Sequence, residues 1–557
     1  MTELIRKYAL QNAILHKGKA ELQAVVSKIV AEKPDLKQKI KELIPEIKKV
    51  VLEVNSIPLE KQKQALEKLA PELLIKERRE LEKKLPELPN VGKKVILRFA
   101  PGPSGPLHLG HSRAAILNDE YAKMYGGKLI NRIEDTDPDR IDPSAYELIK
   151  EDLDWLEIKA HDTVIQSDRF EIYYEYAKKL LEQNNAYVCK CNAKDWRALK
   201  LQSKACEHRN LPIEKNLEEF DKMLSNFYKQ EEASVIVKTD LSDPNPALRD
   251  FVALRICQTP HPKTGNKYIV YPLMNFAVAI DDYLLGLTHV LRGKDHINNT
   301  YRQARIFDYF KWRKPQYIHY GRVSIEQAVL KTSKIKEGIK SGVYESWSDP
   351  RLATLSALRK RGIHPRAIRN LWIATGIKEV DIQLAWENLY TLNKEIIDKS
   401  ANRYFFVWKP KLLEITGIDR LEGHAPLHPD FKERGTRKVV LEKPIKVFVS
   451  EDDLKALKIN DKIRLKDLCN IELTARTKAK YIGQDLAILK EGAKIIHWVN
   501  ANENIKTKVI FPNATIAEGF AEEHVKKELG NIVQFERFGF VKVNKLNEFL
   551  ICYFAHR

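Results

Sequence analysis

The sequence has no long hydrophobic run. Its longest apolar stretch, residues 268–280, is interrupted by Pro272 and Asn275 and falls short of the ~20 apolar residues that a membrane-spanning helix needs. The first residues also lack the uninterrupted apolar segment and small-residue cleavage site of a secretory signal. The sequence therefore predicts no membrane association and a cytoplasmic location.

Cysteine is scarce as well, and six cysteines in 557 residues exclude the dense disulfide framework of small secreted proteins. Cys189 and Cys191 nevertheless form one close pair, and Cys206 and His208 form a second pair after 14 intervening residues. Two such pairs are typical of tetrahedral zinc, and four protein ligands leave no open position for catalysis. We interpret the cluster as a structural Zn²⁺ site, with ordinary free thiols as the alternative.

Acidic side chains are outnumbered, with 76 Asp and Glu against 95 Lys and Arg and a net charge of +19. This excess favours a polyanionic partner, with nucleic acid ahead of an anionic membrane. Hydrophobic residues make up 43% of the chain, which excludes a mostly disordered protein. The length excludes a single compact domain.

Residues 1–88 contain one aromatic residue, Tyr8, and one glycine, Gly18, while apolar residues recur at helical spacing. This pattern predicts a small N-terminal helical extension. We expect proline to divide it into short helices at Pro34, Pro45, Pro58, Pro71 and Pro86.

The rest of the chain changes pattern three times. Residues 89–342 alternate strands and helices, which predicts a doubly wound α/β domain of Rossmann type with an insertion at about 186–255. Residues 343–402 predict a helical connector. Residues 403–557 contain short alternating runs that predict one or two β-barrels, with 28 Lys and Arg against 21 Asp and Glu.

The first motif is HLGH at residues 108–111, which follows a predicted strand and a Pro/Gly-rich loop and begins a predicted helix. Free backbone N–H groups and the dipole favour phosphate there, and His108 and His111 can donate to its oxygens. Gly110 would let a nucleotide approach the backbone closely. The alternative for the two histidines is helix capping or packing.

The second motif is KTSK at residues 331–334, near the end of the α/β region. The ammonium groups of Lys331 and Lys334 on a polar loop could reach a triphosphate. Such a string by itself is usually a solvated loop. Its occurrence after HLGH on this α/β alternation makes phosphate chemistry the better interpretation.

Together the two motifs resemble the HIGH and KMSKS motifs of class I aminoacyl-tRNA synthetases, with Leu109, Thr332 and Ile335 as departures. The blocks RFAPGPSGPLHLGH, LNDEYAKMYGGKLINRIEDTDPDR and YPLMNFAVAIDDYLLGLTHVLRGKDH are similar to archaeal-type glutamyl-tRNA synthetases. AKIIHWV and VQFERFGFVKVN resemble their anticodon-binding barrels. The resemblance thus spans nearly the whole chain.

This resemblance implies ATP-dependent ligation of L-glutamate to the 3' end of tRNA(Glu) through a glutamyl adenylate, with Mg²⁺ and with tRNA(Gln) as an additional candidate. It implies an acceptor-binding role for the insertion, which resembles the zinc-binding insertion of some relatives. The implied catalytic residues are His108, His111, Lys331 and Lys334. The implied ATP-binding residues are these four with Gly110 and Ser333. The implied amino-acid-binding residues are Arg98, Ala100, Glu134, Tyr271, Asn275 and Arg292.

Three other functions stay open from the sequence. A glutaminyl-tRNA synthetase shares the fold and barrels, but the guanidinium of Arg292 suits a carboxylate and offers no acceptor to an amide. A non-catalytic tRNA-binding scaffold is disfavoured by the intact HLGH and KTSK motifs. A truncated paralogue that modifies a tRNA base is disfavoured by the long β region.

Overall fold

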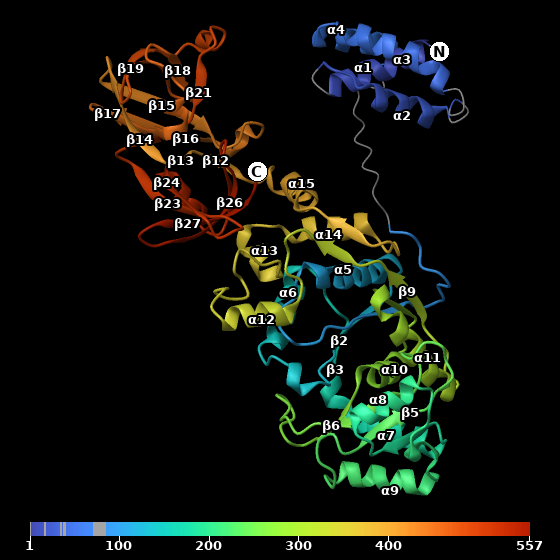
Figure 1. Cartoon of the computed structure of the whole chain (residues 1–557). Helices are drawn as coiled ribbons and strands as arrows, with labels where there is room; N and C mark the ends of the chain where they lie inside the picture. Colours follow the sequence, from blue (N-terminus) through green and yellow to red (C-terminus); the bar gives the residue numbers. More distant parts are fainter. Residues whose placement is uncertain (1, 16–17, 34–35, 37–39, 71–84) are drawn as a thin grey trace. The chain divides into compact units, whose positions relative to one another are not determined.

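A computed structural model describes residues 2–15, 18–33, 36, 40–70 and 85–557 (Figure 1). The chain divides into two compact units, Met1–Lys84 and Leu85–Arg557. In the described ranges, no helix is both long enough and apolar enough to cross a membrane. Leu85 and Leu88, which the sequence places in the helical extension, are non-helical and are buried in the core of the second unit.

The described part of the first unit contains α1 (Thr2–Leu15), α2 (Leu22–Glu32), α3 (Ile40–Asn55) and α4 (Leu59–Leu69). Ile29, Ile47 and Val54 are fully buried between these helices. Pro58 precedes α4 as predicted, whereas the expectation that Pro45 separates two helices is wrong, because Pro45 lies inside α3. Burial of the apolar face of α3 outweighs the one hydrogen bond that proline removes. Pro34 and Pro71 lie outside the described residues.

The centre of the second unit is a parallel sheet. Strands β1 (Ile96–Phe99), β2 (Lys128–Ile133) and β3 (Asp162–Ile165) form one part, and β8 (His289–Gly293) and β9 (Gln316–Tyr320) form the other. The backbone N–H of Thr288, just before β8, donates to the carbonyl of Ile96 at 3.0 Å and joins the two parts. The resulting strand order β3-β2-β1-β8-β9 confirms the predicted doubly wound class, with the strand order reversing between β1 and β8.

Helices follow these strands as the sequence predicts. The helices α5 (Leu109–Met124), α6 (Ala145–Trp155) and α7 (Phe170–Glu182) follow β1, β2 and β3, and α11 (Ile297–Tyr309) follows β8. A further helix, α10 (Met274–Leu284), precedes β8. The central strands β1, β2 and β8 present mostly buried residues, since helices cover a doubly wound sheet on both faces.

The region after α7 builds an antiparallel sheet from β4 (Ala186–Cys189), β5 (Ser234–Val237), β6 (Phe251–Ile256) and β7 (Val270–Pro272). The helices α8 (Ala193–Leu201) and α9 (Ile213–Leu224) lie between β4 and β5 in sequence. The sheet thus extends past residue 255 to β7. After β7 the chain continues directly into α10 and then into β8 of the parallel sheet.

Short strands β10 (Val323–Ile325) and β11 (Ile382–Leu384) pair in parallel. Three helices lie between them in sequence: α12 (Thr332–Lys340), α13 (Leu355–Arg361) and α14 (Pro365–Thr375). α15 (Trp386–Ile397) completes this segment. Gly362 ends α13 with φ +90°, a left-handed conformation that glycine adopts readily at the end of a helix. Buried residues of α13–α15 share one core with β1 and α5, so this connector packs onto the parallel sheet.

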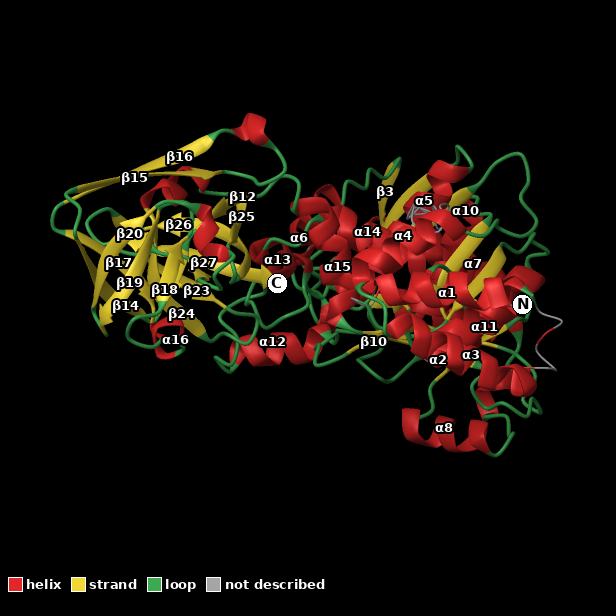
Figure 2. Ribbon diagram, turned by 90° about the horizontal axis from the view of Figure 1, so that it is seen from above, coloured by secondary structure: helices red, strands yellow, loops and turns green. Residues whose placement is uncertain are grey.

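Two seven-stranded sheets form most of the C-terminal region, which Figure 2 shows as clustered strands. The first has edge strands β12 (Asn402–Tyr404) and β13 (Phe406–Trp408), and the second has edge strands β21 (Lys494–Ile496) and β22 (Val499–Asn500). In each sheet the two edge strands are consecutive in sequence, so the sheet curls back toward closure. This confirms the predicted all-β, barrel-like region.

The inner strands complete both sheets. The first sheet contains β23 (Asn504–Ile510), β24 (Ile516–Glu522), β25 (Ile532–Phe535), β26 (Gly539–Leu546) and β27 (Leu550–His556). The second contains β14 (Pro410–Thr416), β17 (Ile445–Ser450), β18 (Lys462–Leu465), β19 (Cys469–Ala475) and β20 (Lys478–Gly483), with the short α16 (Glu451–Lys455) after β17. A separate hairpin consists of β15 (Arg420–Pro426) and β16 (Thr436–Glu442).

Candidate active site

A cavity of about 680 Å³ opens at the carboxyl ends of β1, β2, β8 and β9. This is the edge where doubly wound sheets bind ligands, beside the reversal of strand order. The structure places the following predicted residues in its lining: Arg98, Ala100, His108, Gly110, His111, Glu134, Arg292 and Lys331. Motifs more than 200 residues apart in sequence therefore meet in one cavity.

The two HLGH histidines form a stacked pair at the start of α5. His108 is the N-cap, and its Nδ1 accepts from the backbone N–H of His111 at 3.2 Å. The ring centroids lie 3.6 Å apart. Burial and the neighbouring His111 lower the pKa of His108 to about 2, and burial lowers the pKa of His111 to about 4. At neutral pH both rings are thus uncharged, and His108, which accepts at Nδ1, carries its proton on Nε2 as a donor.

Close packing joins the HLGH loop to the KTSK segment. A side chain at Gly110 would place its Cβ 3.0 Å from the ring of His108, so the glycine makes room for the histidine itself. A side chain at Gly105 would come within 2.9 Å of Thr332 and Trp347. The backbone of Leu330, directly before KTSK, hydrogen-bonds to His108.

The expectation of a polar KTSK loop is wrong in one respect. Lys331 is the N-cap of α12, and Ser333 and Lys334 lie in the first turn of that helix. Lys331 lines the cavity, whereas Ser333 and Lys334 are exposed and do not line it. Ile335 is 1% exposed, so its burial anchors this first turn in helical form.

Buried charges form the opposite end of the cavity. Arg132 is fully buried and donates to Glu134 Oε1 at 2.9 Å and to Asp282 Oδ1 at 2.6 Å. These contacts fix the carboxylate of Glu134 at the cavity wall. Arg98 donates to the carbonyl of Leu291 at 3.2 Å. Burial raises the pKa of Glu134 and lowers that of Arg98, which indicates a pocket whose charges favour a charged ligand.

Tyr271 and Asn275 do not line this cavity. Tyr271 is fully buried on β7, its ring lies edge-on to Phe170, and its hydroxyl has no hydrogen-bond partner among the described residues. Asn275 lies in the first turn of α10 and accepts from Gln303 at 3.3 Å. The structure therefore places these two residues outside the set that lines the cavity.

The lining residues that the sequence reasoning missed include Arg113, Met274, His296 and Arg322. Arg113 follows HLGH on α5 and is 2% exposed, and it donates to the carbonyls of Gly321 and Gly376. A charged residue on an otherwise apolar helix face was the available signal for it. His296 follows Arg292 by four residues, and this spacing could have identified it.

The four predicted metal ligands come together. The ligand atoms of Cys189, Cys191, Cys206 and His208 all lie within 4.8 Å of one another. The Sγ atoms of Cys189 and Cys206 are 3.7 Å apart, and Cys191 Sγ is 3.4 Å from His208 Nδ1. Zn–S bonds of about 2.3 Å in a tetrahedron require sulfur atoms about 3.8 Å apart. The donor set and its spacing therefore fit tetrahedral zinc.

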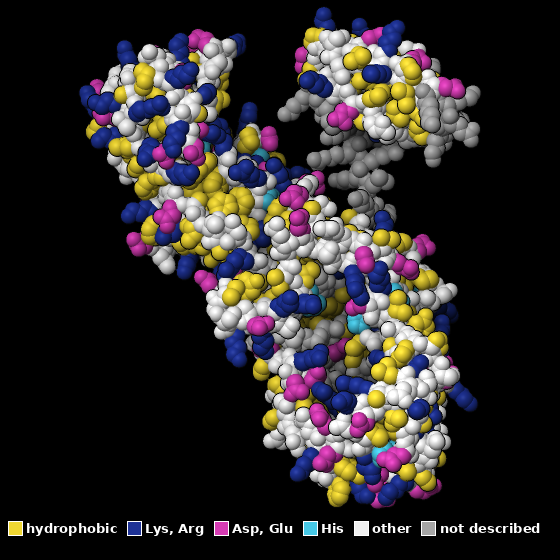
Figure 3. Space-filling model, in the orientation of Figure 1, with side chains coloured by type: hydrophobic (Ala, Val, Ile, Leu, Met, Phe, Trp, Pro, Cys, Tyr) yellow, Lys and Arg dark blue, Asp and Glu magenta, His cyan; other side chains and the backbone are white. Residues whose placement is uncertain are grey.

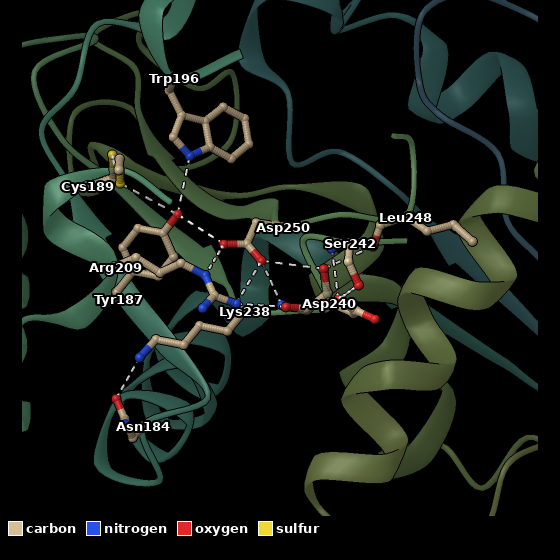
Figure 4. A network of polar contacts seen from close by, with 12 residues as sticks. Asn184, Tyr187, Cys189, Trp196, Arg209, Lys238, Asp240, Ser242, Leu248 and Asp250 are labelled. Atoms are coloured by element: carbon tan, nitrogen blue, oxygen red, sulfur yellow. Dashed lines mark hydrogen bonds and ion pairs between the residues drawn. The ribbon is translucent and has the colours of Figure 1, made fainter. Parts of the chain in front are cut away.

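A polar network holds this cluster in place (Figure 4). Tyr187 lies two residues before Cys189 on β4, and its hydroxyl lies 3.8 Å from Cys206 Sγ. The same hydroxyl donates to Asp250 Oδ2 at 3.2 Å and accepts from Trp196 Nε1 at 3.2 Å. Asp250 also accepts from Arg209, next to His208, at 2.9 Å. Both ligand pairs are thus tied to one buried carboxylate.

Two further cavities lie between the cluster and the central cavity. One of about 460 Å³ shares Gly102, Glu134 and Met274 with the central cavity. The other, of about 230 Å³, is lined by both Cys189 and Cys191 and shares Arg255 with its neighbour. The three hollows are thus neighbours that share lining residues, in the order from the cysteine cluster to the central site.

Comparison with known protein families matches three consecutive domains. Residues 94–399 match the catalytic domain of class I tRNA synthetases for E and Q, and residues 401–486 and 495–544 match two anticodon-binding domains of that group. The chain therefore belongs to the class I tRNA synthetases for glutamate and glutamine.

Within that family, the chain is similar to individual glutamate–tRNA ligases of archaea. The chain is 49% identical to a glutamate–tRNA ligase of Methanocaldococcus jannaschii, 48% to one of Methanococcus maripaludis and 47% to one of Pyrococcus furiosus. The alignments cover 100% of this chain and 99–100% of each relative. These similarities confirm the predicted resemblance to archaeal glutamyl-tRNA synthetases.

Proposed function

We propose that this chain joins L-glutamate to the 3' end of tRNA(Glu) in two steps, through a glutamyl adenylate made from ATP. The observation that carries the proposal is the set of side chains that line the central cavity. A phosphate-binding helix start with both histidines faces the same space as Arg98 and Arg292, two buried guanidiniums bonded only to neutral acceptors among the described residues. One cavity can thus hold a triphosphate beside a dicarboxylic amino acid.

The ATP end of the site works by positioning and charge. The start of α5 presents its free backbone N–H groups and its dipole to phosphate oxygens, and the neutral ring of His108 caps this helix start. Gly110 keeps the turn compact against His108. Lys331 brings an ammonium group to the cavity, and Ser333 and Lys334 would approach ATP by a movement of the first turn of α12. Mg²⁺ would enter with ATP and neutralise its phosphates.

The amino-acid end supplies opposite charges to glutamate. Arg98 and Arg292 suit its two carboxylates, and Glu134 suits its ammonium group. Ala100 lines the cavity and leaves space for the substrate. Tyr271 and Asn275 would act indirectly, by supporting these groups. The α-carboxylate can then attack the α-phosphate of ATP without an enzyme nucleophile.

The tRNA is proposed to run along the series of hollows and the barrels. The passage between the cysteine cluster and the cavity is lined by Trp196, Arg197 and Arg255, a stacking ring and cations that suit single-stranded nucleic acid. Lys and Arg side chains are spread over the face drawn in Figure 3. The matched anticodon-binding domains support tRNA(Glu) as the acceptor, and tRNA(Gln) is a second candidate with a related anticodon.

Zinc is proposed as a structural ion held by Cys189, Cys191, Cys206 and His208. The three sulfurs and one imidazole saturate a tetrahedral ion, which supplies folding energy and no open coordination position. The residues that surround the ligands would keep the hollow beside Trp196 in shape for the acceptor end. The expected cytoplasmic location stays a prediction, in keeping with tRNA, ATP and a free amino acid as substrates.

One experiment separates this proposal from its alternatives. Transcripts of tRNA(Glu) and tRNA(Gln) are aminoacylated separately with labelled glutamate and labelled glutamine. Glutamate on tRNA(Glu) is the expected product, and glutamate on both transcripts would add the second acceptor. Glutamine as the charged amino acid would identify a glutaminyl enzyme. The absence of all four products in protein that binds tRNA would favour a scaffold.

A further inference from the structure

Neutral side chains hold the guanidinium of Arg292. Its Nη1 donates to Gln303 Oε1 at 2.9 Å, and its Nη2 donates to Thr300 Oγ1 at 2.5 Å. Gln303 and Thr300 lie three residues apart on α11, so one helix face presents both acceptors. Arg292 is 6% exposed, which leaves the guanidinium little freedom to turn away from the cavity.

The amide of Gln303 has a fixed orientation. Gln303 is fully buried, and its Nε2 donates to Asn275 Oδ1 at 3.3 Å. Because the NH₂ end is used by Asn275, the carbonyl end faces Arg292. Asn275, which does not line the cavity, is thus linked to Arg292 through Gln303.

The buried arginines around the cavity differ in how their charge is balanced. Arg132 contacts the carboxylates of Asp282 and Glu134 within 3.0 Å. Within the described part of the chain, the hydrogen bonds of Arg98 and Arg292 go to a backbone carbonyl, an amide and a hydroxyl. Burial and the charge of Arg98 lower the pKa of Arg292 to about 10, so it remains a cation at neutral pH. Its positive charge is thus left for an anionic ligand.

We propose that Gln303 is a specificity-determining positioning residue, because it anchors Arg292 without neutralising it and so keeps the cation available for the side-chain carboxylate of glutamate. This inference rests on the proposed function and deepens it. A carboxylate at position 303 would anchor the guanidinium equally well but would cancel its charge. A glutamate side chain would then lose its attraction to the site, whereas the uncharged side chain of glutamine would not.

The test is Gln303→Glu, which preserves side-chain size and the acceptor for Arg292. Amino-acid-dependent pyrophosphate exchange is measured with glutamate and with glutamine, in the presence of tRNA. We expect kcat/KM for glutamate to fall about 100-fold, mainly through KM, while kcat/KM for glutamine changes less than about threefold. Equal losses for both amino acids would overturn the proposal, as would an unchanged KM for glutamate.

Gln303→Met is the matched control, since it has similar length but no charge and no acceptor. It removes one anchor and leaves the charge of Arg292 uncancelled, while Thr300 still accepts from the guanidinium, so we expect kcat/KM for glutamate to fall clearly less than in Gln303→Glu and kcat/KM for glutamine to change little. A preference that shifts as far in Gln303→Met as in Gln303→Glu would overturn the role of charge. Thermal unfolding and tRNA binding of both variants should match the parent protein within a few degrees and about twofold.

A different result is expected if the proposed function itself is wrong. The parent protein would then show no glutamate-dependent exchange, which would overturn both the function and the inference. If the parent protein catalyses glutamate-dependent exchange but Gln303→Glu keeps the same preference for glutamate over glutamine, only the inference about Gln303 is overturned.

Discussion

Arg132 Nη1 and Asp282 Oδ1 lie 2.6 Å apart in a fully buried ion pair that links β2 to α10 beneath the amino-acid end of the cavity. The other face of the same guanidinium holds Glu134. The pair therefore connects the stability of the sheet to the geometry of the site. Removal of one partner would leave the other charge buried and partly uncompensated.

Asp282→Asn is accordingly expected to lower the free energy of unfolding by about 3 kcal/mol and to weaken glutamate binding by loosening Glu134. Denaturant unfolding and the KM for glutamate measure the two effects. Lys455→Met removes an exposed i,i+4 partner of Glu451 and should cost less than about 0.5 kcal/mol. A loss in Asp282→Asn no larger than in Lys455→Met would contradict the structural role of the buried pair.

The pKa of His111, about 4 in the folded chain, predicts a pH effect on stability. The unfolded chain binds a proton at His111 near pH 6.5, and the folded chain does not until about pH 4. Stability should therefore be lost as pH falls from about 6.5 to about 4, by about 3 kcal/mol from this group. His111→Asn, measured by urea unfolding across this range, should lose less on acidification than the parent protein. Parallel pH profiles would rule out a neutral, buried His111.

Lys334 tests whether the first turn of α12 moves during catalysis, since its ammonium is exposed and outside the cavity lining. Lys334→Ala should lower kcat for adenylate formation by about 10² to 10³, while tRNA affinity changes little. Lys340→Ala, at the other end of the same helix, should leave exchange unchanged. A defect confined to tRNA binding would refute the proposed phosphate role of Lys334.

The cysteine cluster predicts about one zinc per chain in purified protein. Cys206→Ser should release the metal and impair tRNA acceptance more than ATP binding, because the cluster lies beside the hollow lined by Trp196. Cys469→Ser is the matched control: this buried cysteine lies in β19 and should not affect the metal content. A metal-free protein with full aminoacylation activity would end the zinc proposal.

Local sequence signals sufficed for the parts of the site that depend on one segment. HLGH follows a strand and begins a helix, so the position of His108 as N-cap could be predicted. KTSK was expected on a polar loop, whereas burial of Ile335 selects a helix. That contact is tertiary and has no local signature.

Contacts between distant segments could not be predicted from the sequence. The pairing of Arg132 with Asp282 joins residues 150 positions apart, and Gln303 meets Arg292 only because α11 folds back along β8. Tyr271 and Asn275 were assigned to the substrate site by resemblance, but neither is among the residues that line the cavity. The periodicity of apolar residues predicts which face of a helix or strand is buried. Only the packed structure shows which residues that face contacts.

The central claim is that the cavity selects glutamate by the charge of Arg292, and Arg292→Cys tests it most directly. Glutamate- and glutamine-dependent pyrophosphate exchange are measured for the parent protein and the variant, with tRNA present. The account predicts that kcat/KM for glutamate falls by about 10² to 10³ while glutamine loses much less. A loss of the same factor for both amino acids would contradict the account and would make Arg292 a structural or ATP-site residue.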